Sequence, residues 1–294
     1  MSGTLTYSGK SYPFNGKRLR EANEINLAAS GAHSLIIEPA LYASDQETPA
    51  GSNAPQGYGY ASALLDGKGT LTLAGRLGDG NILTAALPAD ISLNPGYRLF
   101  LQPYSRADST LAGSFELTAH ALSGRQQLLP VALRWSKTAG SKDGSYPMGF
   151  VRSGAVVDLF CLAYMEPWQA PQTKPPLITL LNRWGVSSGS SKLYTLNYSN
   201  PGNAQPSPLQ ASINLSDKNV LSAGPGAPAG LRLSLNPTTG VITGSLPSGK
   251  STINFSGILR QPTDGSERLL GAGQLVIPAV APGKPTYVEF DILR

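Results

Sequence analysis

The sequence predicts an all-β protein of many short antiparallel strands, and three observations support that prediction. Gly (33) and Pro (24) are abundant among the 294 residues, whereas charged residues make up only 14%. With 40% hydrophobic residues, this composition indicates a packed core interrupted by frequent turns. Short runs of alternating apolar residues also recur along the whole chain, which is the pattern of half-buried strands.

Each predicted strand is short and is bounded by Gly, Pro, Asn, Asp or Ser. The runs are 70–77, 82–87, 97–104, 110–118, 128–135, 155–164, 192–198, 209–215, 230–236, 240–246, 252–260 and 287–293. Their spacing favours sequential pairing, as meanders or Greek keys, in barrel-like or sandwich-like sheets. The pairs Asp66-Gly67 and Asp79-Gly80 are typical of hairpin turns between such strands.

The chain is expected to divide into two β-rich halves. We assign residues 1–163 to the first half and residues 178–294 to the second. A Pro-rich connecting loop over 164–177 separates them, since prolines cannot continue a central strand. One continuous barrel is the alternative.

Three segments share one internal pattern, at residues 3–19, 69–87 and 240–259. Each starts with Gly and an alternating run, turns through a Gly-rich stretch and continues with a second alternating run. The first and third also share Ser-Gly-Lys-Ser at the turn. The pattern predicts internally repeated β units.

Residues 244–251, GSLPSGKS, match the phosphate-loop pattern, with Gly244, Gly249, Lys250 and Ser251 at its defining positions. A phosphate loop must open a helix, because free N–H groups at the helix N-terminus hold the phosphates. The residues that follow, TINFSGIL, alternate like a strand. We therefore interpret the match as a false one, in a hairpin turn, and expect no nucleotide site.

Several motifs taken together resemble a known kind of module. They are YGYAS with GTLTLAGRLGDG at 58–80, LAGSF at 111–115, LRW at 133–135, YPMGF at 146–150 and GVITGSL with INFSGILRQ and GAGQLVI at 240–277. The chain resembles a Gly-rich all-β repeat module found near the C-termini of large secreted or surface proteins of some environmental bacteria. The resemblance implies an extracellular module, usually appended to adhesion-like or sugar-recognising domains, and it brings no catalytic motif. This chain departs from the pattern in standing alone.

The residues needed for catalysis or metal binding are scarce. One cysteine, Cys161, and two histidines are too few for a Cys/His zinc site, and no Ser-His-Asp arrangement or calcium loop is visible. Glu289 and Asp291 share a strand face, where a solvated pair is favoured over a catalytic one. Cys161 lies among apolar residues and is predicted to be a core thiol. We expect a non-enzyme with no catalytic residue, cofactor or metal.

Aromatic residues supply the candidate ligand-binding positions. Trp168 lies in the Pro-rich segment, Trp184 follows it, and Tyr58 and Tyr60 flank a glycine. Exposed rings on loops can stack on sugars, so these four residues define an alternative function as a carbohydrate-binding module. Core packing is the competing interpretation.

The leading functional expectation is a non-enzymatic structural or adhesive module of the extracellular space or cell surface. Edge strands such as 3–7 or 287–293 would allow assembly with further copies, and a surface polysaccharide is the other partner considered. A hydrolase with an unrecognised site is a third alternative. The 23 Lys and Arg residues are dispersed, which disfavours nucleic acid as a partner, and no apolar stretch is long enough for a transmembrane helix. Because this chain shows no signal peptide, a cytoplasmic location stays open.

Overall fold

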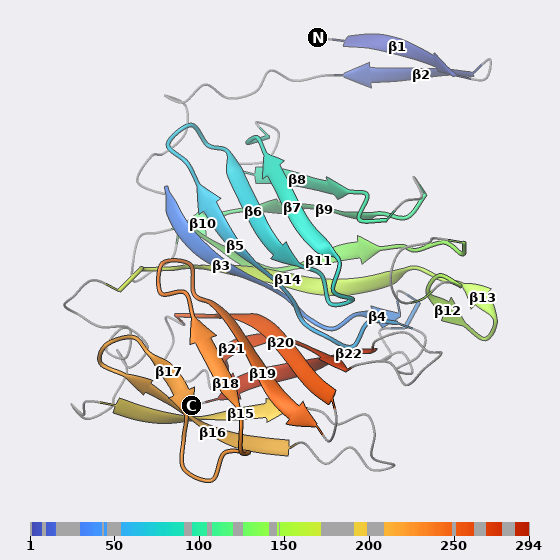
Figure 1. Cartoon of the computed structure of the whole chain (residues 1–294). Coiled ribbons are helices and arrows are strands. Elements are labelled where there is room, and N and C mark those ends of the chain that lie inside the picture. The colour runs from blue at the N-terminus through green and yellow to red at the C-terminus, as the bar shows by residue number, and fades with distance from the viewer. Residues whose placement is uncertain are drawn as a thin grey trace.

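The structure, a computed structural model, describes residues 2–7, 10–15, 30–42, 44–45, 54–90, 96–104, 108–119, 126–140, 146, 148–171, 191–198, 209–248, 251–261, 269–277 and 286–293. The regular structure in these ranges is all β-strand, and the strands pair antiparallel in two large sheets and two small hairpins (Figure 1). The predicted all-β antiparallel fold is confirmed. Within the same ranges, no helix could cross a membrane.

The first sheet holds ten strands, and its main strands follow one another as a meander. They are β3 (Gly31–Ile37), β5 (Gly59–Leu65), β6 (Leu71–Arg76), β7 (Ile82–Leu87), β8 (Gly96–Leu101), β9 (Leu111–Glu116), β11 (Gln126–Trp135) and β14 (Leu159–Pro167). Two short strands, β4 (Leu41–Tyr42) and β10 (Thr118–Ala119), pair with β14 and β11. The last main strand returns to the first, since β14 pairs with β3 from Pro167↔His33 to Ala163↔Ile37.

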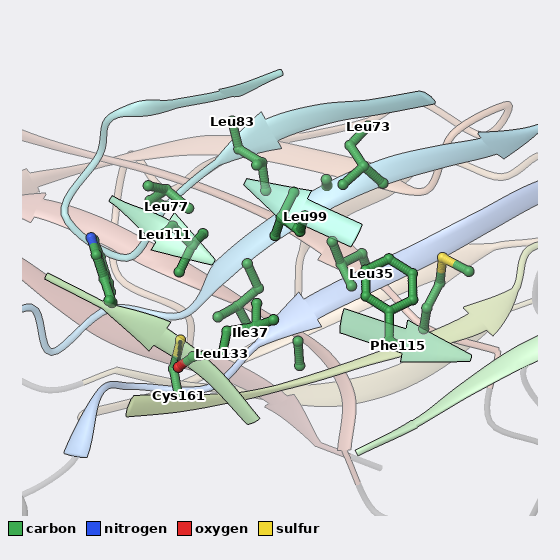
Figure 2. Packing of buried hydrophobic residues seen from close by; sticks show 14 of the residues in the cluster. Leu35, Ile37, Leu73, Leu77, Leu83, Leu99, Leu111, Phe115, Leu133 and Cys161 are labelled. Atoms are coloured by element: carbon green, nitrogen blue, oxygen red, sulfur yellow. Dashed lines mark hydrogen bonds between the residues drawn. The ribbon is translucent and has the colours of Figure 1, made fainter. Parts of the chain in front are cut away.

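This first sheet is a nearly closed barrel. Its two ends, β7 and β8, are joined by one bridge between Asp90 and Gly96 and then diverge (Figure 1). The inward residues of all eight main strands fill the interior, and Figure 2 shows Leu35, Leu83 and Leu99 converging there from three strands. Eight-stranded barrels have interiors about as wide as their own side chains, so this packing is the expected outcome.

The second sheet repeats the same plan with eight strands. They are β15 (Ser191–Tyr198), β16 (Leu209–Ser216), β17 (Leu221–Ala223), β18 (Arg232–Leu235), β19 (Val241–Ser248), β20 (Ser251–Leu259), β21 (Leu269–Ile277) and β22 (Thr286–Leu293). β22 pairs with both β21 and β15, and the ends of the order, β17 and β18, lie next to each other. A cavity of about 10 Å³ beside Phe255 and Phe290 leaves room for about one water molecule.

Two hairpins complete the described structure. β1 (Ser2–Tyr7) pairs with β2 (Lys10–Asn15), and β12 (Val151–Arg152) pairs with β13 (Ala155–Val156). The β1–β2 hairpin is a sheet of its own and lies apart from both large sheets (Figure 1).

The three similar segments each contain one hairpin, β1–β2, β6–β7 and β19–β20. Their descent from one repeated unit stays a prediction. The strand β14 extends to Pro167, four residues into the segment assigned to the connecting loop, because its outer residues are covered by the second sheet. Residues 172–177 of that segment lie outside the described residues.

The Asp-Gly turns form as predicted where the structure describes them. Asp66 Oδ1 accepts hydrogen bonds of 2.8 Å from the backbone N–H groups of Lys68 and Thr70. Asp79 caps its turn at Asn81 and is itself buried, with Tyr104 donating its hydroxyl to Oδ2 at 2.5 Å. Burial raises the pKa of Asp79, although the bonds from Tyr104 and Asn81 oppose that effect.

Cys161 is confirmed as a core thiol. It is fully buried in the first sheet, and its Sγ lies 3.8 Å from the carbonyl oxygen of Leu133 (Figure 2). Burial raises the pKa of the thiol to about 12, so the reactive thiolate is suppressed at neutral pH.

Candidate functional site

The two large sheets share a buried interface, where apolar, charged and hydrogen-bonding side chains meet. The outer faces of β3 and β5 contact β20, and β5 also contacts β21. The centre of the interface is apolar, formed by Ile36 and Tyr60 from the first sheet and Ile258 and Ala272 from the second. These residues alternate with inward core residues on their strands, so each sheet uses both of its faces here.

A buried ion pair flanks the apolar centre. The Arg260 guanidinium donates from Nε to Glu166 Oε2 at 3.0 Å and from its second nitrogen to the other carboxylate oxygen. Its side chain is 7% exposed and that of Glu166 13%. The guanidinium also lies 4.8 Å from the ring centre of Tyr164. This two-point geometry fixes the two sheets relative to each other, because Glu166 is the last but one residue of β14 and Arg260 directly follows β20.

Further hydrogen bonds cross between the sheets beside this pair. Ser34 donates its hydroxyl to the Leu259 carbonyl at 2.7 Å. Gln169 and Gln261 are joined by two hydrogen bonds. The Gln169 backbone N–H donates to Gln261 Oε1 at 2.7 Å, and Gln261 Nε2 donates to the Gln169 carbonyl at 2.8 Å. The polar side chains of Ser34, Arg260 and Gln261 therefore have partners at the contact, which burial requires.

Trp168 is the residue by which the chain leaves the first sheet, and it is buried in the core of the second. It is 1% exposed. Its backbone N–H bonds to the Ala32 carbonyl at 2.8 Å and its indole N–H to the Pro237 carbonyl at 3.2 Å. Gly240, at φ 77°, lies under the ring, where a Cβ would come within 3.0 Å of Cζ3. Stacking on a sugar would require an exposed Trp168 ring. The expectation that the ring is exposed is wrong, because turns distant in the chain cover it.

The other predicted aromatic positions differ among themselves. Tyr60 is 4% exposed and belongs to the interface centre, so the expectation that it is exposed is also wrong. Tyr58 is partly buried at the interface edge, where its N–H meets the Gly273 carbonyl at 3.3 Å. Burial raises the pKa of Tyr58, and the nearby Glu289 charge adds to the rise. Trp184 lies outside the described residues.

Acidic groups gather at the Tyr58 edge of the interface. Glu289 is exposed and Asp291 half-buried, and both lie on the outer face of β22. Desolvation raises the pKa of Glu289, and the Asp291 charge raises it further. Desolvation also raises the pKa of Glu38, while Arg260 opposes that shift. Among the described residues no group of three His, Cys, Asp or Glu side chains is placed to hold a metal ion.

Gln274 lies directly opposite Glu289 in the sheet and is fully buried. Neither atom of its side-chain amide has a hydrogen-bond partner within the described residues. Gly57 presses against it, since a Cβ at that position would come within 2.9 Å of the Gln274 Cβ. Strand alternation could not single out Gln274, Arg260 or Glu166, because it assigns a residue to a face without revealing what covers that face.

The phosphate-loop match lies in a hairpin of two paired strands. β19 and β20 pair without a break from Val241↔Ile258 to Ser248↔Ser251, whereas Gly249 and Lys250 lie outside the described residues. A strand, and not a helix, therefore follows the match, as predicted. Gly244 serves packing, since a Cβ there would lie 2.1 Å from Cζ of Phe255 and 2.5 Å from the Arg232 carbonyl oxygen.

The ion pair and the hydrogen bonds described here therefore lie at the contact between the two sheets, where they stabilise the fold. Comparisons with protein-family models, with curated proteins and with solved structures find no match for this chain.

Proposed function

We propose that this chain is a non-enzymatic structural or adhesive module of the extracellular space or cell surface. The observation that carries the proposal is the pair of large sheets, each built on eight main strands, whose interiors are occupied by their own side chains. The cavity described in the second sheet has room for about one water molecule, so we assign function to the outer surface of the described body.

The interface between the sheets supports the same function. A bidentate Arg260–Glu166 pair, the Ser34–Leu259 bond and the shared apolar centre join both halves into one unit. A body that presents its surface to a partner benefits from rigidity, because less freedom is lost on binding.

The residues exposed on β6 and β7 also support the proposal. The exposed positions of β6 and β7 are Thr72, Ala74, Arg76, Ile82, Thr84 and Ala86, of which Arg76 alone is charged. A two-strand surface of this kind suits close contact with another flat surface or another sheet better than it suits solvation by charge.

Two measurements test the proposal. Fractionation of the organism that encodes the chain, followed with an antibody, should find the protein outside the cell or at its surface. The purified chain, coated on a solid support, should retain those cells. The Arg260→Met variant should retain fewer cells, because its two sheets are no longer fixed relative to each other. A protein confined to the cytoplasmic fraction, or a coat that retains no cells, would contradict the proposal.

A further inference from the structure

The β1–β2 hairpin pairs with no further strand in the described structure, and β7 meets β8 only through the bridge between Asp90 and Gly96. We propose that the β1–β2 hairpin of one molecule adds to the free edge of β7 in a second copy, so that the chain assembles by strand addition. The inference rests on the proposed structural role and names the partner that such a module would have.

The hairpin needs a partner for physical reasons. β1 and β2 form a two-stranded sheet that lies apart from the rest of the molecule (Figure 1). A lone two-stranded hairpin is marginally stable in water at best.

The alternation of the ladder identifies β1 as the strand that adds. Tyr7 pairs with Lys10 across two residues, and in such a hairpin the pair that flanks the loop exchanges both hydrogen bonds. Alternate pairs then direct their backbone groups outward, among them Thr4 and Pro13. Proline has no N–H, so the outer edge of β2 lacks a donor that the outer edge of β1 retains at Thr4.

The free edge of β7 is the best receptor among the sheet ends. Its six residues, ILTAAL, include no charge, Pro or Gly, and Ile82 is 69% exposed. Natural edge strands are usually protected by charge, by proline or by shortness. β8 carries Arg98, whereas β17 and β18 have only three and four residues. β7 therefore combines length with a lack of protection.

The edge of β7 faces β8 where the first sheet nearly closes into a barrel. β7 and β8 come together at the bridge between Asp90 and Gly96, and the two strands diverge away from it (Figure 1). Phe100 on β8 is 63% exposed, so apolar side chains are exposed on both strands. An added hairpin would cover this apolar surface and continue the antiparallel order of the sheet.

The connection between the hairpin and the first sheet limits how far the hairpin can reach. Residues 16–29 separate β2 from the first described residue before β3, and these 14 residues can span at most about 50 Å. Mutual exchange would close a dimer, and one-way addition would extend a filament.

Sedimentation velocity of the full chain over a range of concentrations tests the proposal. The wild type should assemble, and Thr84→Lys should raise the dissociation constant at least about tenfold, because a lysine blocks the edge. Thr72→Lys is the matched control, since it puts the same charge on the same face one strand further in, where both edges are paired. Thr4→Pro should act like Thr84→Lys, whereas Ser11→Pro, on the outer edge of β2, should not.

Cross-linking identifies the two segments in contact. The native Cys161 is buried, so introduced cysteines report alone. A mixture of Thr6→Cys and Thr84→Cys molecules should yield a disulfide-linked dimer, and a single chain with both substitutions should link between chains more than within one. Monomers at all concentrations, linkage within one chain only, or equal effects of Thr84→Lys and Thr72→Lys would overturn the proposal. Monomers that still localise to the surface and retain cells would leave the proposed function standing.

Discussion

The Arg260–Glu166 pair should carry a large share of the coupling between the sheets, and Arg260→Met tests this. The substitution keeps much of the apolar stem but leaves Glu166 charged and 13% exposed without its cation. Breaking a buried pair by removing one partner costs about 3–5 kcal/mol. Arg260→Met also removes the cation–π contact with Tyr164, at 4.8 Å, and this loss destabilises the protein further. We therefore expect a decrease of about 3–5 kcal/mol in the free energy of unfolding.

Urea unfolding followed by tryptophan fluorescence provides the assay, since Trp135 and Trp168 report on the first and second sheets respectively. Arg260→Met should shift the midpoint and separate one transition into two. The double variant with Glu166→Gln should lose less than the sum of the two single losses, because the two groups interact.

The exposed pair between Arg134 and Asp158 supplies the control, because the Arg134 side chain is 75% exposed. Arg134→Met should cost at most about 1 kcal/mol. If Arg260→Met cost no more than Arg134→Met, or if the two substitutions at the buried pair were strictly additive, the coupling assigned to the interface would be refuted.

Three further substitutions test the packing and the charges. Trp168→Ala should destabilise by about 3–5 kcal/mol, measured as the urea midpoint, because it empties a buried site beside Gly240; a change below about 1 kcal/mol would mean that the ring is dispensable. Gly244→Ala should cost about 1–3 kcal/mol and leave any ATP signal in a thermal-shift assay unchanged, because the new Cβ would meet Phe255; an ATP-dependent shift that the substitution abolishes would restore the phosphate-loop interpretation. Glu289→Gln should stabilise the protein at pH 7 but not at pH 4. The folded pKa of Glu289 is raised above 4.5, so ionisation costs stability as the pH rises through that value; an equal effect at both pH values would contradict the assignment.

The strands, hairpins and core thiol could be predicted from the sequence because their causes are local. Alternation placed Leu73 and Leu83 inward, Asp66 and Asp79 marked turns, and apolar neighbours marked Cys161 as buried. Each of these predictions depends on residues a few positions apart.

The interface could not be predicted, since its partners are distant in the chain. Glu166 and Arg260 are separated by 94 residues, and alternation alone leaves their strand face open to solvent or to another sheet. The expectation of an exposed Trp168 is wrong for the same reason, because Gly240 and the Pro237 carbonyl, both distant in the chain, cover the ring.

The return of the last strand to the first in each sheet has a consequence for how this chain folds. β3 gains its second neighbour only when β14 has been made, and β15 likewise waits for β22. Pairing between such remote segments slows folding, because the entropy of the intervening chain must be lost first. A ribosome must therefore release all of a sheet before it can close, and a fragment cut within one sheet would carry a permanently open edge. The smallest piece of this chain expected to fold alone is a whole sheet.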